Sequence, residues 1–162
     1  MDRRILVIDD DVAIQKVLVQ HLSNGHTEVH AASDGQSGVA LARQCKPDLI
    51  LLDVDMPGIT GHEVCRQLKF DPQTQGIPIA FLTSAGTVSD KILGLDQGAV
   101  DYIVKPFDPF EVAARTRAAF RVKSMVELAA SNTMHDGLTG LGNRAAFEQH
   151  LRAELARAHR SD

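Results

Sequence analysis

Three consecutive carboxylates, Asp9, Asp10 and Asp11, directly follow a run of branched apolar residues at positions 5–8. Four such residues in a row predict a strand that is buried on both faces, as in a parallel sheet. Carboxylates gathered at the end of a buried strand repel one another unless they share a cation. Oxygen ligands of this kind suit Mg²⁺. The alternative is that Asp10 or Asp11 only N-caps the next helix. Because one cap needs one side chain, three acids favour the metal site.

Three further strand-like runs end in groups that could do chemistry. The runs at 49–52, 77–82 and 100–104 are followed by, or end at, Asp53, Thr83 and Lys105. In open α/β sheets, ligands bind outside the carboxyl ends of the strands, at the point where the strand order reverses. We therefore expect an acid, a hydroxyl and a lysine to meet the first acidic residues in one crevice.

The segments between these runs predict helices. They cover residues 11–23, 34–45, 60–70 and 88–97, and a last helix begins near 108–109. The first of them carries apolar residues at near-helical spacing, namely Val12, Val17, Leu18, Val19 and Leu22. Residues 27–32 alternate enough to form a strand at or near the sheet edge. Five β/α units in about 120 residues imply a single doubly wound α/β domain.

The polar strand ends resemble a known family. The chain resembles the receiver domain of two-component response regulators in the set Asp9, Asp10, Asp53, Thr83 and Lys105. The segments 52–58 and 102–107 also match that family closely, and the resemblance covers residues 1–122. It implies a flavodoxin-like fold, in which five parallel strands have the order 2-1-3-4-5. The three aspartates at positions 9, 10 and 53 would then lie side by side.

The resemblance also implies a reaction. Asp53 would be the nucleophile that takes a phosphoryl group from a phosphohistidine, carried by a cognate histidine kinase or phosphotransfer protein. Asp10 and Asp53 would ligate Mg²⁺ directly, and Asp9 would act through water. The backbone carbonyl of Asp55 would be a further ligand.

Three residues would read the phosphorylated state. Lys105 would give a compact positive charge to the phosphoryl oxygens, aimed inward by a cis Lys-Pro bond as in the family. Its alternative is a surface lysine before a turn. Thr83 would hydrogen-bond the attached phosphoryl group. Tyr102 would swing inward when Thr83 moves, and its alternative is ordinary strand packing.

Composition sets limits on these expectations. The 162 residues carry a net charge of −4, so no nucleic-acid surface is indicated. No apolar run is long enough to span a membrane and the N-terminus is not a signal peptide, so we expect a cytoplasmic protein. Cys45 and Cys65 are interpreted as small buried hydrophobes. His21, His26 and His30 fall on different elements and are interpreted as surface residues, not as a metal cluster.

A long helix is predicted after the receiver-like region. From Pro109 to about residue 132 there is no further Pro and no Gly, so one helix of roughly 36 Å can form. Its residues Ala118, Val122, Met125 and Ala129 are spaced by four, three and four positions, which is a coiled-coil-like stripe. This spacing predicts a stalk that forms a homodimer. The alternative is a helix that packs back on its own sheet.

The end of the chain carries a second resemblance. Residues 136–144 are similar to the start of GGDEF domains, the diguanylate cyclases that make cyclic di-GMP from GTP; the matching residues are Asp136, Leu138, Thr139, Gly140, Leu141, Asn143 and Arg144. Ala145 departs from the family, which often has a second arginine there. The sequence thus predicts a receiver domain at 1–122, a helical linker at 123–134 and a GGDEF fragment at 135–162, cut just inside the output domain.

Two functions remain open at this stage. In the first, the chain is the phosphoryl-receiving switch and dimerisation stalk of a diguanylate cyclase. In the second, it is a phosphorylation-independent adaptor that holds a partner. The complete acidic set favours the first, because an adaptor would not need Asp53 and Lys105 together. A free-standing cyclase is excluded, since these residues contain neither the Gly-Gly-(Asp/Glu)-Glu-Phe loop nor the strand with the first metal-binding aspartate.

Overall fold

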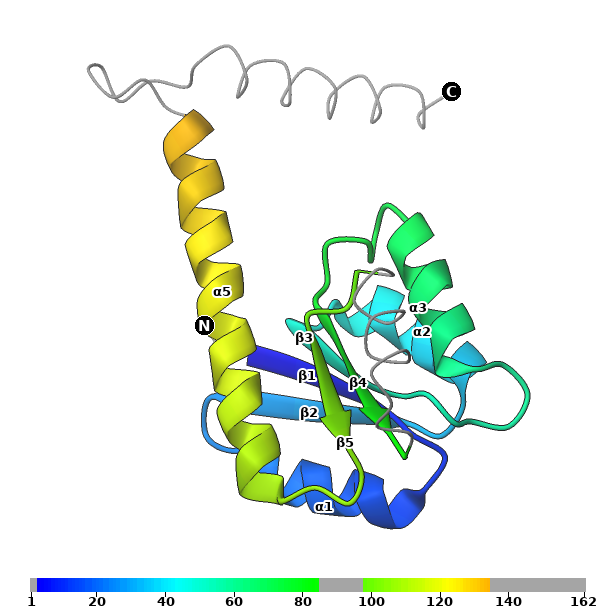
Figure 1. The fold of residues 1–162 in the computed structure, drawn as a ribbon. Helices are drawn as coiled ribbons and strands as arrows, with labels where there is room; N and C mark the ends of the chain where they lie inside the picture. The colour runs from blue at the N-terminus through cyan, green and yellow to red at the C-terminus, as the bar shows by residue number, and fades with distance from the viewer. Residues whose placement is uncertain (1–2, 85–97, 135–162) are drawn as a thin grey trace. The chain divides into compact units, whose positions relative to one another are not determined.

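Five parallel strands form one sheet in the part of the chain that the structure describes. The computed structural model describes residues 3–84 and 98–134. The strands are β1 Arg3–Ile8, β2 Thr27–Ala32, β3 Leu49–Asp53, β4 Ile79–Thr83 and β5 Asp101–Val104. Their order is β2-β1-β3-β4-β5 (Figure 1). This arrangement confirms the predicted flavodoxin-like fold, and β2 is the edge strand that the sequence predicts.

The strand register places the acidic residues side by side. β1 pairs with β2 on one side and with β3 on the other, and Ile8 lies opposite Leu52. Asp9 and Asp53 each follow the residue of that pair on their own strand. The strand order reverses at β1 and β3, which is where open α/β sheets bind their ligands.

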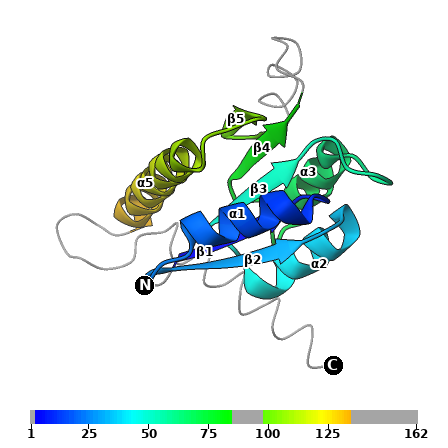
Figure 2. The same cartoon turned by 90° about the horizontal axis from the view of Figure 1, so that it is seen from below.

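Four described helices cover the two faces of the sheet. They are α1 Val12–Leu22, α2 Gly35–Cys45, α3 Gly61–Phe70 and α5 Pro109–Met134. The helices α1 and α5 pack on one face, and α2 and α3 pack on the other (Figure 2). Each agrees with its predicted range to within about two residues. The predicted helix at 88–97 lies outside the described residues.

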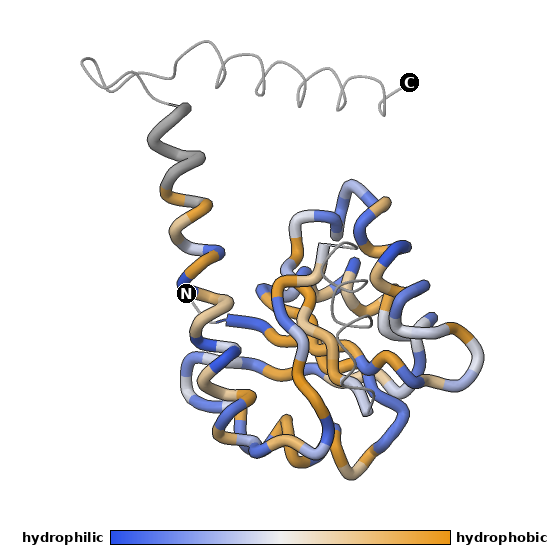
Figure 3. Tube along the Cα trace, viewed as in Figure 1, coloured by the Kyte–Doolittle hydropathy of each residue, from blue (hydrophilic) through white to orange (hydrophobic). Residues whose placement is uncertain are grey.

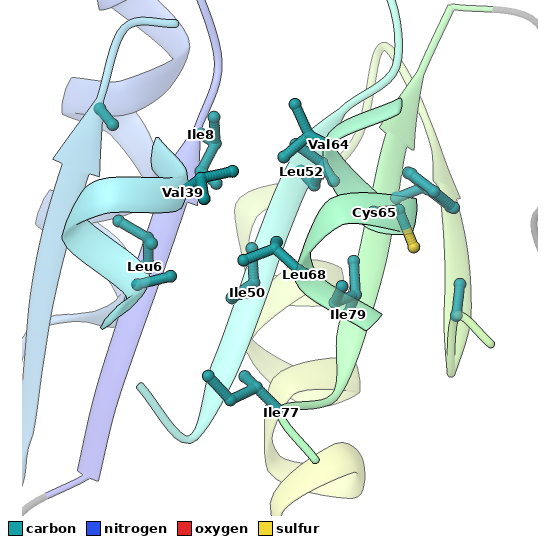
Figure 4. Packing of buried hydrophobic residues seen from close by; sticks show 14 of the residues in the cluster. Leu6, Ile8, Val39, Ile50, Leu52, Val64, Cys65, Leu68, Ile77 and Ile79 are labelled. Atoms are coloured by element: carbon teal, nitrogen blue, oxygen red, sulfur yellow. The ribbon is translucent and has the colours of Figure 1, made fainter. Parts of the chain in front are cut away.

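The central strands supply two separate cores. Leu6 and Ile8 of β1 point into the cluster under α2 and α3, which Figure 4 shows from close by. Ile5 and Val7 alternate with them and point into the cluster under α1 and α5. All four are fully buried, so β1 is hydrophobic over residues 5–8, after the two arginines with which it begins (Figure 3). This is the pattern that a parallel strand covered on both faces requires.

The start of α3 is built to lie against the strand that carries Asp53. Thr60 and Glu63 form a capping box, in which each side chain accepts a hydrogen bond from the other residue's backbone N–H. Gly61 follows the cap, and a Cβ there would collide with the carbonyl oxygen of Asp53. Only glycine permits this close approach, so the sequence fixes how tightly α3 closes over the end of β3.

One buried position of α1 differs from the predicted pattern. Val12 and Val17 are exposed, although they belong to the predicted apolar stripe. The buried face of α1 is formed by Leu18, Leu22 and a polar residue, Gln15. Apolar spacing alone therefore does not identify which residues of α1 face the sheet.

The last helix, α5, continues beyond the residues of the compact unit that contains the sheet. Residues Met1–Phe120 form one compact unit, and α5 continues to Met134. Within the unit, the guanidinium of Arg3 lies 4.4 Å from the centre of the Phe120 ring. The predicted domain boundaries at residues 122 and 134 stay predictions. Among the described helices, none combines the length and the apolar character needed to cross a membrane.

Candidate acidic phosphoacceptor site

Three carboxylates from two strand ends lie within reach of a single ion. One oxygen each of Asp9, Asp10 and Asp53 can be chosen so that all three lie within 4.8 Å of one another. Asp9 and Asp53 are buried, whereas Asp10 is exposed. The structure therefore brings together the three aspartates that the sequence places at the ends of β1 and β3.

A lysine from β5 joins the same cluster. The Nζ atom of Lys105 lies 2.8 Å from Oδ2 of Asp9 and 3.1 Å from Oδ2 of Asp53. Its backbone N–H donates to the carbonyl of Thr83, at 2.7 Å, and the Lys105–Pro106 bond is cis, as predicted. Lys105 is thus an inward-facing group of the site and not a surface lysine.

The acidic triplet divides between two tasks. Asp11 is the N-cap of α1, and its Oδ1 accepts hydrogen bonds from the backbone N–H groups of Ala13 and Ile14 at 2.7 and 3.4 Å. Its own N–H donates to Oδ1 of Asp9, at 2.9 Å. The capping alternative therefore holds for Asp11 alone, while Asp9 and Asp10 remain available to the acidic site.

The local electrostatics fit a divalent cation. Burial raises the pKa of Asp53, and the neighbouring Asp9 carboxylate raises it further, against the opposing effect of Lys105. Burial disfavours the charged form of Lys105, but its two carboxylate partners together raise the pKa of this lysine. Three carboxylates against one ammonium leave excess negative charge on hard oxygen ligands, which is the donor set that Mg²⁺ prefers.

The loop after β3 folds back over the site. The backbone N–H of Asp55 donates to Oδ1 of Asp53, at 3.3 Å. The exposed carboxylate of Asp55 accepts from the backbone N–H of Ser84, at 3.4 Å. These bonds place the Asp55 peptide beside the nucleophile candidate. Metal ligation by its carbonyl stays a prediction.

Thr83 and Tyr102 occupy the neighbouring strand ends. Thr83 is fully buried at the end of β4, and Tyr102 is buried in β5. Tyr102 lies opposite Phe81 in the register, and their ring centres are 5.5 Å apart. The ring of His62 also packs on Phe81, and the centres of these two rings are 4.9 Å apart. In this structure Tyr102 is packed within the strand, as its alternative interpretation predicts. Its role as a switch stays a prediction.

An apolar groove borders the acidic cluster, and the sequence pattern did not predict it. It has a volume of about 510 Å³ and lies between α1 and the segment 105–109, with Ile14, Val17 and Phe107 among its lining residues. Lys105 also lines it. Each lining residue is unremarkable alone, and only the packing of two distant segments creates the hollow.

The stalk residues belong to one helix. Ala118, Val122 and Met125 are exposed on α5. Ala129 lies in the same helix, but its side chain is outside the described part. The stripe therefore presents apolar side chains to solvent in the single chain, and its role in dimerisation stays a prediction.

Comparison with known proteins identifies the class. Residues 5–117 match the response regulator receiver domain family. The chain therefore belongs to this family, and it is a phosphoaccepting receiver domain of a two-component system.

Two relatives from different organisms match most of this chain. The chain is 45% identical over 130 residues to the DNA-binding dual master transcriptional regulator RpaA of a Synechocystis species, covering 80% of this chain and 54% of that protein. It is 42% identical over 127 residues to the response regulator PleD of Caulobacter vibrioides, covering 78% and 28%. The chain thus spans about half of these relatives or less.

A solved structure agrees with the receiver fold. A putative response regulator from Chloroflexus aurantiacus is 33% identical, with a TM-score of 0.69 over 75% of this chain and 99% of that one.

Replacing Asp53 tests the electrostatic conflict directly. Because the pKa of Asp53 is raised in the folded state, its ionisation destabilises the fold as pH rises from the ordinary aspartate value through the folded value. We expect metal-free Asp53→Asn to melt above wild type at pH 7, by a margin that shrinks towards pH 4. Saturating Mg²⁺ should reverse the order, since wild type gains more from the ion. Calorimetric melting at several pH values decides. If the metal-free variant is less stable than wild type at pH 7, ionised Asp53 does not destabilise the fold and the prediction is wrong.

Replacing Lys105 tests whether the lysine competes with the ion. Lys105→Ala removes the ammonium that sits on both buried carboxylates, so we expect Mg²⁺ to bind several-fold more tightly. Lys16→Ala, an exposed lysine on α1, is the matched control. Isothermal titration with Mg²⁺ measures both. Weaker binding by the Lys105 variant alone would show that the lysine supports the site and does not compete with the cation.

Proposed function

We propose that this chain is a Mg²⁺-dependent phosphoacceptor in which Asp53 is the residue that is phosphorylated. The observation that carries the proposal is the meeting of Asp9, Asp10 and Asp53 with Lys105 at one edge of the sheet. A structural salt bridge would need one acid and one base. The additional buried acid is favourable only where a cation is bound.

The proposal keeps the roles that the resemblance to the receiver family implies. Asp10 and Asp53 would ligate Mg²⁺ directly, Asp9 would act through water, and the Asp55 carbonyl would complete the protein ligands. When bound, Mg²⁺ would neutralise charge between the carboxylates and the incoming phosphoryl oxygens. An Asp53 oxygen forms a bond to phosphorus while the bond from phosphorus to the imidazole nitrogen of the donor breaks. The donor is a phosphohistidine of a histidine kinase or phosphotransfer protein.

Phosphorylation would rearrange the charges around Lys105. In the unphosphorylated chain the ammonium bridges Asp9 and Asp53. Conversion of the Asp53 carboxylate to an acyl phosphate removes one of these anionic partners and places phosphoryl oxygens nearby. The Lys105 ammonium would then pair with the phosphoryl oxygens, and Thr83 would donate a hydrogen bond to one of them. Tyr102 would move inward in response to the displacement of Thr83.

For the output we propose control of a diguanylate cyclase through the α5 stalk. The similarity of residues 136–144 to the start of GGDEF domains supports this proposal. A cyclase that joins two GTP molecules needs two domains facing each other, so its regulator must control dimer geometry.

The second candidate is a DNA-binding output, which the relative RpaA favours. The prediction of no nucleic-acid partner therefore applies to these residues only.

The full-length protein distinguishes these outputs. Formation of cyclic di-GMP from GTP, stimulated by phosphorylation, would support the cyclase. Binding of duplex DNA without cyclase activity would support the second candidate. The adaptor alternative predicts that partner binding is the same in wild type and Asp53→Asn.

The phosphoacceptor assignment has a direct test. Incubation with acetyl phosphate and Mg²⁺ should add one phosphoryl group to wild type and none to Asp53→Asn, since no other carboxylate is buried beside Lys105 and Asp9 in the described chain. Asp10→Asn keeps the nucleophile but removes a ligand, so we expect much slower modification. Intact mass gives the extent of reaction. Equal modification of Asp53→Asn, or no effect of a chelator, would show that the assignment is wrong.

The stalk can be tested on this chain alone. Val122 and Met125 are 59% and 67% exposed, and a parallel dimer would bury them. Small residues at Ala118 and Ala129 keep the seam weak, because little apolar area is buried per heptad. We expect beryllofluoride, a phosphoryl mimic, to promote dimers of wild type but not of Val122→Asp/Met125→Asp. Phe70→Asp, at an exposed apolar site on α3, is the control. Sedimentation measures association, and unchanged association of the double variant would exclude this seam.

A further inference from the structure

Gln15 is a polar side chain on the buried face of α1. It is only 9% exposed and lies on the same side of the helix as Leu18 and Leu22. A primary amide at such a position is costly unless its donors and acceptors find partners. A leucine would fill the same helical position without that cost. The retention of an amide here therefore calls for a reason in its contacts.

The contacts of Gln15 join the ends of two strands. Its Nε2 donates to the carbonyl of Asp9 at 2.6 Å, to the carbonyl of Ala32 at 3.2 Å, and to Oγ of Ser33 at 3.0 Å. Ala32 is the last residue of β2, and its carbonyl also accepts from the Asp9 N–H, at 3.1 Å. The amide thus continues the link between β1 and β2 beyond their last ladder pair.

The hydrogen bond from Gln15 to Asp9 affects the acidic site because it holds a peptide group between two of the acidic residues. The Asp9 carbonyl belongs to the peptide unit that joins Asp9 to Asp10. Rotation of that unit would redirect both carboxylates relative to Asp53. On the other side of this loop, the Asp11 N–H holds Oδ1 of Asp9, and Asp11 caps the helix that carries Gln15. The loop between β1 and α1 is therefore tied at both ends.

We propose that Gln15 is a positioning residue for the phosphoacceptor site, which fixes the Asp9–Asp10 peptide so that two carboxylates are presented together to a divalent cation beside Asp53. The proposal rests on the proposed Mg²⁺-dependent function of the same site. It assigns to α1 a role in the chemistry, through a residue that touches neither the phosphoryl group nor the ion.

The competing explanation is that Gln15 only satisfies buried carbonyls and so supports the fold. The two explanations differ in what a loss of stability does to ion binding. A purely structural residue changes the melting temperature and leaves the Mg²⁺ affinity of the folded chain unaltered. A positioning residue changes the affinity by more than any equally destabilising substitution elsewhere on α1.

The main variant is Gln15→Met, which keeps the length and unbranched shape of the side chain but removes its donors. Loss of a group that orients metal ligands typically weakens binding by 10–100-fold, and we expect on the order of ten-fold here. Isothermal titration with Mg²⁺ gives the affinity, and melting of the metal-free protein gives the stability. The initial rate of modification by acetyl phosphate at low Mg²⁺ should fall in parallel and recover substantially at high Mg²⁺.

Two controls on the same helix separate position from stability. Gln20→Met makes the same chemical change at an exposed site and should alter nothing. Leu18→Ala removes a fully buried side chain, so it should lower the melting temperature at least as much as Gln15→Met while Mg²⁺ affinity is retained. If Gln15→Met does not fold, Gln15→Asn decides, because it keeps an amide that is too short to reach Asp9.

An affinity of the Gln15 variant no weaker than that of Leu18→Ala would overturn the proposal. The proposed function itself fails in a different way. In that case wild type neither binds Mg²⁺ nor is modified at Asp53, and no comparison between variants arises.

Discussion

Two buried carboxylates, Asp9 and Asp53, face one ammonium group, that of Lys105, and the rest of the domain is arranged around this conflict. Burial opposes ionisation of Asp53, and so does the neighbouring carboxylate of Asp9. The Lys105 ammonium offsets only part of this effect, so the surrounding fold must hold the two acids in place. The parallel sheet supplies the rigidity, because residues 5–8 and 49–52 are anchored on both faces. A group kept in an unfavourable electrostatic state by rigid neighbours is ready to accept a cation and then a phosphoryl group.

The sequence predicts most of this site because strand ends are easy to recognise. A short apolar run that stops at a charged or polar residue marks both the strand and the edge of the sheet at which it ends. Asp9, Asp53, Thr83 and Lys105 all follow this rule. The division of labour within the acidic triplet could not be predicted. Whether Asp10 or Asp11 caps α1 depends on one backbone rotation, and the structure assigns the cap to Asp11.

Gln15 was beyond prediction for a different reason. Apolar periodicity identifies buried positions by their hydrophobicity, so a buried amide is treated as a surface residue and exposed valines such as Val17 are treated as core. Its three partners lie in two other segments, at positions 9 and 32–33. The same holds for the row of rings formed by His62, Phe81 and Tyr102. Contacts between distant segments become visible only once the strand order and register are known.

Under the proposed function, a change at the site can reach the α5 stalk only through elements that exist in two arrangements. Phe81 and Thr83 lie two residues apart on β4, so their side chains share one face of the sheet, and Phe81 touches the ring of Tyr102. The predicted displacement of Thr83 would therefore act on a packed row of rings and not on a single side chain. Asp101, the neighbour of Tyr102, is paired with Arg115 of α5 at 3.0 Å. Because a ligand shifts an equilibrium only by its differential affinity, a coupling of this modest kind suits a seam with alanine at two of its four positions. A strongly apolar seam would stay closed whatever happened at Asp53.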